Sequence, residues 1–344
     1  MRDLAERLLA RGDTPLVYTP EPGEIAQELR RSGVEVAVDP RKLSAKPDLI
    51  HGHHEIPAMK ALLYFRGVPG LFVCHDRRHH SDIPPAFPRI CRYVAVDYYC
   101  RERLIEHGIA EERIRIVPNG VDLARFRPRD PLPERPRRAL VFSNNASERA
   151  YLSVVREACA RAGLSLDVIG AAAGTPCERP ETVLGQYDIV FAKGRSAVEA
   201  AAVGTAVVLL YAHDAGPLVT SGNLDGLRRL DGRTKHLWQR PLDSEVIAGE
   251  IARYDARDAA EVSRRVRRWA DLDGVVRQLV MIYHEVLTEH ARADGCDVEE
   301  TAAATAYRRR SRGRRLRDRT KRVPGLGPLL LAVKQKIAPY RPEF

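Results

Sequence analysis

The stretch from Tyr187 to Tyr211 (YDIVFAKGRSAVEAAAVGTAVVLLY) constrains the fold more than any other part of the sequence. Its first six residues are mostly apolar and predict a short strand that is buried on both faces. A three-residue loop (KGR, 193–195) follows, and then come a short helix over Ser196–Val203 and a second apolar strand over Thr205–Tyr211. The stretch therefore predicts a strand–loop–helix–strand unit of an α/β protein.

The loop of this unit places positive charge where a helix begins. Lys193 and Arg195 flank Gly194, and the first turn of the helix supplies free backbone N–H groups. Amide donors, the helix dipole and fixed cations together favour a bound phosphate. A structural alternative stays open, because Ser196 and Glu199 have the S-x-x-E spacing of a capping box, in which Glu199 would only bond the backbone of Ser196.

Length and composition point to a soluble protein of two domains. The chain has 344 residues, of which 44% are hydrophobic and 30% are charged, and this length suits two domains of ordinary size. No apolar run approaches the roughly 20 residues of a membrane span, and the N-terminus lacks the apolar core of a signal peptide. The six cysteines are scattered without a C-x-x-C pair, which is typical of a reducing cytoplasm and argues against a zinc site.

Strand-like and helical segments alternate along the first 130 residues, which is the pattern of a doubly wound parallel sheet. The predicted strands are Pro15–Thr19, Val34–Val38, Pro47–His51, Gly70–His75, Tyr93–Asp97 and Arg113–Val117. The predicted helices are Asp3–Arg11, Glu24–Arg31, Pro57–Phe65 and Tyr98–His107.

A proline-rich connection, Arg127–Arg138, separates this half from a second series of the same kind. The second series contains strands at Ala139–Ser143 and Leu166–Ile169 and a helix near Ala150–Ala162, and it includes the stretch described first. Two Rossmann-like halves joined in this way predict a ligand cleft between the carboxyl ends of two sheets.

Two segments of the chain resemble the GT-B glycosyltransferases, and in particular the large retaining family 4. IVPNGVDLARFRP (Ile116–Pro128) is similar to the segment that leaves the N-terminal domain of these enzymes, and KGRSAVEAAAVGTAVVLL (Lys193–Leu210) is similar to their donor-binding segment. The helix Arg101–Ile109 and Tyr283 also match, so that the resemblance covers roughly Pro15–Leu287. It implies an α/β protein with two Rossmann-like domains facing a central cleft. It also implies metal-independent transfer of a sugar from a nucleotide-sugar, with no cofactor, and a donor diphosphate held by the C-terminal domain.

The match to the family is uneven. Family 4 usually has two glutamates eight positions apart; Glu199 matches the second, which holds the donor ribose, but Phe191 stands in place of the first. The family's Arg and Lys after the first strand of the C-terminal domain are replaced by Ser-Asn-Asn at 143–145, and Lys193 and Arg195 can supply phosphate contacts instead. The resulting donor-binding candidates are Lys193, Gly194, Arg195, Ser196, Glu199 and Asn144.

Histidines gather after two predicted strands of the N-terminal half. HGHH (51–54) follows the strand PDLI, and His75, His79 and His80 follow GLFVC. A turn of this kind lacks the register of a metal site, so we predict none, and surface turn positions are the expectation for His79 and His80. His75 matches a family histidine close to the transferred sugar, so it is the candidate for a catalytic or donor-orienting role. Asn119 and Asp122 are expected to hold the turn between the domains.

One element of the family pattern is absent. Family members open with a strand and a glycine-rich turn, whereas this sequence begins at Met1 inside the expected first helix. Because the first strand is central in the doubly wound order, its loss predicts two unpaired inner strand edges. Either the start is placed too far downstream or the N-terminal domain is degenerate, and the second alternative favours a non-enzymatic role.

The net charge of +10 belongs to the C-terminal tail. Ten Lys/Arg and one acidic residue fall between Arg308 and Arg322, and the apolar segment Leu326–Val333 follows. A run of arginines is commonly solvated, but cations beside a short apolar helix also suit an anionic membrane surface, here through residues 308–333. Without aromatic interleaving, the tail argues against nucleic acid.

The sequence predicts a cytoplasmic glycosyltransferase, of the retaining hexosyltransferase type, that acts on a glycan or lipid-linked acceptor. A non-catalytic nucleotide-sugar-binding or scaffold protein and a sugar-nucleotide epimerase remain as alternatives, although an epimerase needs a pair of cleft carboxylates that the sequence does not offer. The predicted domains are 1–128 (acceptor-side Rossmann-like), 129–138 (linker), 139–263 (nucleotide-sugar-binding), 264–306 (C-terminal helices) and 307–344 (basic amphipathic tail).

Overall fold

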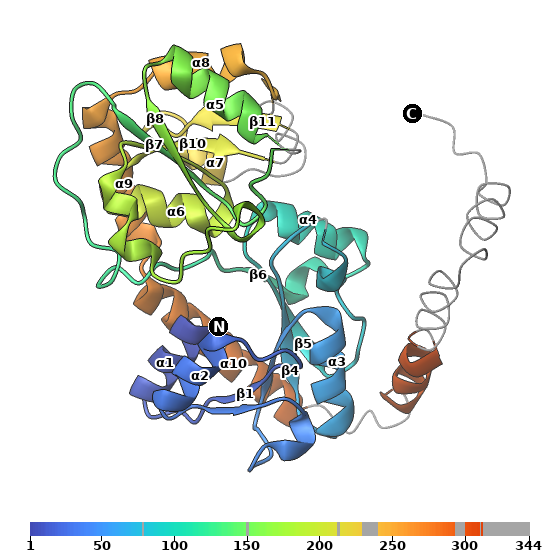
Figure 1. Ribbon diagram of the computed structural model, residues 1–344. Coiled ribbons are helices and arrows are strands. Elements are labelled where there is room, and N and C mark those ends of the chain that lie inside the picture. Colours follow the sequence, from blue (N-terminus) through green and yellow to red (C-terminus); the bar gives the residue numbers. More distant parts are fainter. Residues whose placement is uncertain are drawn as a thin grey trace, which may run out of the picture.

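The chain folds into two α/β halves, as a computed structural model shows (Figure 1). The structure describes residues 1–77, 79–148, 151–211, 214–228, 240–292, 300–309 and 311. A long helix, α10 (Leu272–Arg292), leaves the second half and returns to the first.

The N-terminal half follows the predicted alternation of strands and helices. Its strands are β1 (Leu16–Tyr18), β2 (Glu35–Ala37), β3 (Ile50–His53), β4 (Gly70–Cys74), β5 (Ile90–Ala95) and β6 (Ile114–Ile116). Its helices are α1 (Arg2–Ala10), α2 (Glu24–Arg31), α3 (Glu55–Tyr64) and α4 (Tyr98–Glu106), with short 3₁₀ turns at η1 (Pro40–Lys42), η2 (His80–Asp82) and η3 (Glu111–Arg113).

These strands form two separate parallel sheets. One has the order β3-β4-β5-β6, and the other pairs β1 with β2. Among the described strands, the end strands of these two sheets, β1, β2, β3 and β6, each have a partner on one side only. Unpaired strand edges in this half were predicted above; that a first strand is missing stays a prediction.

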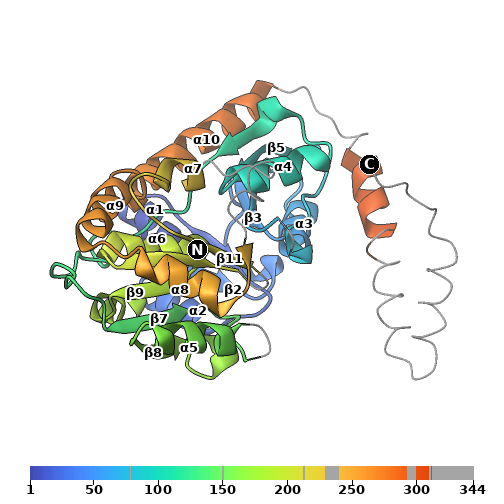
Figure 2. The ribbon, with the colours of Figure 1, turned by 90° about the horizontal axis from the view of Figure 1, so that it is seen from above.

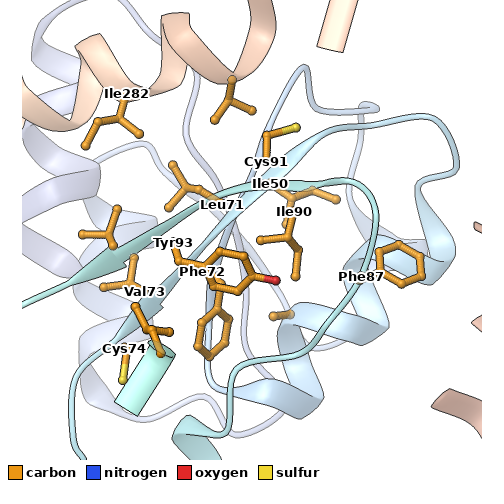
Figure 3. Packing of buried hydrophobic residues seen from close by; sticks show 14 of the residues in the cluster. Ile50, Leu71, Phe72, Val73, Cys74, Phe87, Ile90, Cys91, Tyr93 and Ile282 are labelled. Carbon is orange, nitrogen blue, oxygen red and sulfur yellow. The ribbon is translucent and has the colours of Figure 1, made fainter. Parts of the chain in front are cut away.

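The core of the N-terminal half lies around β4 and β5 (Figure 3). All five residues of β4 are buried, and Phe72 and Tyr93 have at most 1% of their surface exposed. Ile282 of α10 packs into the same cluster. Apolar side chains on both faces of a parallel strand are what a doubly covered sheet requires.

The C-terminal half is built on one six-stranded sheet of order β12-β11-β10-β9-β7-β8. Its strands are β7 (Arg138–Phe142), β8 (Ser165–Ile169), β9 (Ile189–Ala192), β10 (Ala206–Leu210), β11 (Asp214–Leu218) and β12 (Arg240–Pro241). Its helices are α5 (Leu152–Arg161), α6 (Gly194–Val203), α7 (Leu224–Arg228), α8 (Ser244–Ala252) and α9 (Ala256–Trp269), with 3₁₀ turns η4 (Ala171–Ala173), η5 (Pro180–Thr182) and η6 (Leu184–Gln186).

Four strands of this sheet pair in parallel, as predicted, whereas the pairings of β11 are antiparallel. β7, β8, β9 and β10 pair in parallel, β11 pairs antiparallel with β10, and the edge strand β12 pairs antiparallel with β11. Antiparallel edge strands on an otherwise parallel sheet are common in α/β proteins.

The two chain crossings between the halves are bonded to each other. The N–H of Val121 donates to the carbonyl of Ala270 at 2.7 Å, and the N–H of Leu272 donates to the carbonyl of Val121 at 3.1 Å. Asp122 is buried, and its Oδ1 accepts the N–H of Ala124 at 3.1 Å, so the turn-holding role predicted for Asp122 is confirmed. These bonds fix where the chain leaves one half and returns to it.

Helix α10 closes the N-terminal half with one buried face. Val275, Leu279, Ile282 and Val286 recur at helical spacing and join the N-terminal core. Viewed from above, α10 lies beside β5 (Figure 2), in agreement with an ion pair of 3.2 Å between Arg92 and Glu285. None of the helices in the described residues is long and apolar enough to cross a lipid bilayer.

Candidate functional site

The predicted phosphate-binding loop lies at the carboxyl edge of the C-terminal sheet. β9 is fully buried and ends at Ala192, after which Lys193 becomes the N-cap residue of α6. Gly194 has a φ of 55°, a value that favours glycine, and a Cβ placed there would meet no atom within 4 Å. The backbone of the first turn is therefore open to an approaching ligand.

The capping-box alternative is excluded. α6 begins at Gly194 and not at Ser196, and its N-cap residue makes no side-chain hydrogen bond. Ser196 lies inside the first turn, too late to act as a cap. The carboxylate of Glu199 instead accepts the Nε–H of Arg195, with Nε and Oε1 2.8 Å apart. Glu199 and Arg195 therefore act as a pair on one face of α6.

Asn144 lies at the same edge of the sheet but is partly committed to the fold. β7 and β9 are parallel neighbours, so the residues after Phe142 and after Ala192 emerge together. The side-chain oxygen of Asn144 accepts the N–H of Ala171 at 3.3 Å, which holds the loop after β8. The side-chain oxygen of Asn144 therefore already has a structural role in holding this loop.

An ion network joins α6 to the N-terminal half. Arg195 donates to the carboxylates of both Asp3 and Glu199, and Asp3 also accepts from Arg125 at 3.0 Å. Arg125 in turn reaches Glu181 at 3.1 Å. Asp3 and Glu199 are buried, at 6% and 7% exposure. Helix α1 therefore contacts the predicted donor site directly, which the sequence did not indicate.

Burial and ion pairing shift the pKa values of this network in opposite directions. Burial alone would raise the pKa of Asp3, but the hydrogen bond and charge of Arg195 hold it below its ordinary value. Burial raises the pKa of Glu199 in spite of Arg195. Burial acts to lower the pKa of Arg195, yet Glu199 and Asp3 together raise it. The guanidinium therefore stays charged at any physiological pH.

Three histidines form a stacked column at the carboxyl edge of the N-terminal sheet. The ring of His53 stacks on His51 with centroids 4.6 Å apart and on His75 with centroids 4.8 Å apart. Nδ1 of His53 and Nε2 of His75 are 2.5 Å apart, and Nδ1 of His51 is 2.6 Å from the Oη of Tyr283 on α10. His51 and His53 reach this column because alternate residues of β3 share a face.

The column is uncharged at neutral pH. Burial lowers the pKa of His51 to about 3 and holds that of His53 well below its ordinary value. Crowding by protein atoms lowers the pKa of His75 to about 4 even though part of the residue is exposed. The charge of Arg195 adds to this lowering. The predicted catalytic histidine and the predicted phosphate-binding arginine, which come from different halves, therefore lie near enough for the charge of one to act on the other.

A second histidine pairing escaped the sequence analysis. Oδ1 of Asp82 accepts the Nδ1–H of His54 at 2.7 Å, and Oδ2 accepts the backbone N–H groups of His75 at 3.1 Å and Asp76 at 2.7 Å. Asp82 is 1% exposed. No motif spacing links position 54 to position 82, because the contact depends on β3 and β4 being neighbours.

His79 and His80 are exposed, as predicted, and their rings lie together with centroids 4.6 Å apart. In the part of the chain that the structure describes, no three His, Cys, Asp or Glu side chains converge as metal ligands would.

Comparison with known proteins agrees with this geometry. Residues 1–125 match the family described as Glycosyltransferase Family 4. A glycosyltransferase from Rickettsia africae ESF-5 superposes with a TM-score of 0.59 at 16% identity, over 83% of this chain and 93% of that one. HepE from Anabaena, in complex with UDP and glucose, superposes with a TM-score of 0.61 at 14% identity, over 82% and 94% of the two chains.

The chain has the GT-B fold. The resemblance to family 4 is confirmed for residues 1–125, and the α/β architecture of the GT-B fold is confirmed over the part of the chain that these structures cover. Sucrose-phosphate synthase from Thermosynechococcus elongatus shares this fold with a TM-score of 0.52 at 12% identity, over 84% and 92% of the chains. No curated protein matches the sequence.

Proposed function

We propose that this GT-B protein is a glycosyltransferase that moves a sugar from a nucleotide-sugar to an acceptor hydroxyl. The observation that carries the proposal is the opposition of two edges. The cationic start of α6, with Arg195, lies near the histidine column that ends at His75, since the charge of Arg195 acts on His75. One edge suits an anionic diphosphate, and the other suits the uncharged hydroxyls of a sugar.

The donor site is built from the backbone of α6 and the charged side chains beside it. The first-turn N–H groups and Arg195 would hold the diphosphate, Lys193 would approach from the N-cap position, and Glu199 would bind the ribose hydroxyls. Because fixed cations neutralise the charge that develops on the leaving diphosphate, the reaction would proceed without a metal ion. The resemblance to family 4 favours a hexosyl donor and retention of configuration at its anomeric carbon.

UDP-sugars are the first donors to test, because the structures of HepE hold UDP, glucose and UDP-glucose. Calorimetry with UDP, GDP and ADP should detect binding of at least one nucleotide. The matching nucleotide-sugar should then release its nucleoside diphosphate when octyl glucoside is supplied as acceptor, and NMR of the product would report the anomeric configuration. If the folded, full-length protein bound none of the three nucleotides, the proposal would be wrong.

The acceptor is proposed to be a glycan or a lipid-linked glycan at the cytoplasmic face of a membrane. The supporting feature is the basic, apolar tail, which apart from residues 308, 309 and 311 lies outside the described residues. Cations contribute on the order of 1 kcal/mol each only where they reach an anionic surface. Deleting residues 308–344 should abolish sedimentation with anionic liposomes and leave nucleotide binding intact. Equal binding to neutral liposomes, or tight binding to nucleic acid at physiological salt, would contradict the electrostatic anchor.

A non-catalytic nucleotide-sugar-binding protein is the second candidate. The observation that favours it is the division of the N-terminal strands into two sheets. Such a protein would bind the nucleotide-sugar and leave it unchanged with every acceptor. An epimerase would instead interconvert two nucleotide-sugars without any acceptor.

A further inference from the structure

We propose that His54, held by Asp82, is the catalytic base that takes the proton of the acceptor hydroxyl. The inference rests on the proposed glycosyltransferase function and assigns a residue to its acceptor side. Four features carry it: the backbone of His54, the fixed orientation of its ring, its second ring nitrogen, and its place beside His75.

The backbone of His54 is held in an unfavourable conformation. Its φ is 59° and its ψ is 140°, and it is the only non-glycine residue with a positive φ in the described part of the chain. Glycine would adopt this conformation at lower cost. His54 is also the N-cap residue of α3, yet its side chain caps nothing. Local helix structure therefore does not account for an imidazole at this position.

The ring is oriented by a buried carboxylate. Asp82 can only accept, so its bond of 2.7 Å assigns a proton to Nδ1 of His54 and leaves Nε2 as the basic nitrogen of the neutral ring. Asp82 is itself fixed by the backbone N–H groups of His75 and Asp76. The side chain of His54 is 50% exposed, so its ring is accessible from outside the fold. A carboxylate that orients an imidazole in this way is the arrangement of a general base.

The neighbours of His54 separate it from the other histidines. Ser81 lies 3.1 Å from its Nδ1 and links it to His79, while His53 and His75 lie in the adjacent column. The pKa of His54 is raised by its hydrogen bond with Asp82, whereas burial lowers the pKa of His53 and of His75. His54 is therefore more basic than the two histidines of the column beside it.

The proposed step balances without a further reactant. The acceptor oxygen forms a bond to the anomeric carbon, and the bond from that carbon to the diphosphate oxygen breaks. Its electron pair leaves with the nucleoside diphosphate, whose charge faces Arg195. The proton of the hydroxyl passes to Nε2 of His54 and from there to solvent. The acceptor loses this proton whether configuration is retained or inverted.

His54→Gly, His54→Gln and the matched control His80→Gln test the proposal. His80 is exposed in the same loop region and has no assigned role. Each is assayed with the nucleotide-sugar that the wild-type protein uses best and with octyl glucoside. We expect kcat to fall at least 100-fold in both His54 variants, with UDP affinity by calorimetry unchanged, and to stay within twofold in His80→Gln.

His54→Gly also separates chemistry from folding. Glycine tolerates a φ of 59°, which offsets part of the cost of removing the partner of the buried Asp82, so this variant should still fold, and added imidazole should restore its kcat at least tenfold. Asp82→Asn should move the acidic limb of the kcat profile to lower pH, since the cause of the raised pKa of His54 is lost. A purely structural role would not shift that limb.

Two failures are distinguishable. A His54→Gly variant with kcat within threefold of the wild type, or one whose loss tracks a lower melting temperature and is not rescued by imidazole, would overturn the inference alone. A wild-type protein that binds UDP but transfers no sugar would overturn the proposed function and the inference with it.

Discussion

The two edges that meet in this protein handle charge in opposite ways. On the N-terminal edge, His51, His53 and His75 are packed together and stay neutral. On the C-terminal edge, the side chain of Arg195 is 41% exposed, and it stays charged because Asp3 and Glu199 pair with it. Desolvation disfavours the charged form of any group, and only a partner of opposite charge offsets it. One edge thus presents hydrogen-bonding groups without charge, and the other presents fixed charge.

This contrast teaches how one protein can bind two chemically different parts of one substrate. A diphosphate needs cations that neither titrate nor move, whereas sugar hydroxyls need donors and acceptors that do not attract counter-ions. His54 stands between the two cases, because it lies beside the neutral column but is paired with the buried carboxylate of Asp82.

The largest expected effect concerns stability in acid. The folded-state pKa of His51 is about 3 and that of His75 is about 4, below the ordinary 6.5. Between these values and pH 6.5, the unfolded chain therefore binds protons that the folded chain does not bind. Their contribution to stability is complete above pH 6.5 and is lost as the pH falls toward 4. The free energy of unfolding should fall by up to about 1.4 kcal/mol per pH unit for each such histidine.

Urea unfolding across this pH range measures the effect. His51→Gln should make the pH dependence shallower by up to one proton, and His284→Gln, at an exposed position of α10, should not change it. His54 has the opposite sign, because its raised pKa stabilises the fold below the ordinary value and this gain disappears as the pH rises through the raised one. An unchanged slope in His51→Gln would show that the column is not kept neutral by the fold.

The next effect concerns phosphate. Arg195→Ala removes a charge-assisted bond and leaves the buried carboxylates of Asp3 and Glu199 without it, so affinity for the bound nucleoside diphosphate should fall about 100-fold. Arg195→Lys should recover part of the loss. Arg156→Ala, in an exposed ion pair with Glu148 on the same half, is the control. Calorimetry that gives equal affinity for Arg195→Ala and Arg156→Ala would exclude Arg195 from the donor site.

A smaller loss is expected from Glu199→Gln. If Glu199 holds the ribose hydroxyls, nucleotide affinity should fall by roughly 1.5–3 kcal/mol, whereas Glu157→Gln on α5 should be silent because Glu157 forms an exposed ion pair with Arg161. Unchanged affinity together with an unchanged melting temperature would remove Glu199 from the ribose site. The contrast between the neutral N-terminal edge and the charged C-terminal edge would then depend on Arg195 alone.

The smallest effect should come from Asp3→Asn. Asp3 shares Arg195 with any incoming phosphate, so removing its charge should raise nucleotide affinity a few-fold, by about 1 kcal/mol or less. Asp48→Asn, at an exposed position of the same half, is the control. A loss of affinity in Asp3→Asn would show instead that Asp3 positions Arg195 for the ligand.

Local patterns predicted most of the elements but not their exact ends. β9 and α6 were visible because a run of buried apolar residues and an alanine-rich helix each have their own period. The capping box failed because β9 ends at Ala192 and α6 begins at Gly194, two residues before Ser196. The four-residue pattern S-x-x-E contains no information about where the preceding strand ends.

The sequence by itself determined the two α/β halves, the cationic loop at 193–195 and the histidines after two strands, since each depends on residues close together in the chain. Only the tertiary structure decided which of these groups meet. Asp3 reaches Arg195 across 192 positions, Tyr283 reaches His51 across 232, and Asp82 reaches His54 because β3 and β4 are paired. Such contacts are set by strand order and by the return of α10, and the burial that they create decides which side chains keep their charge.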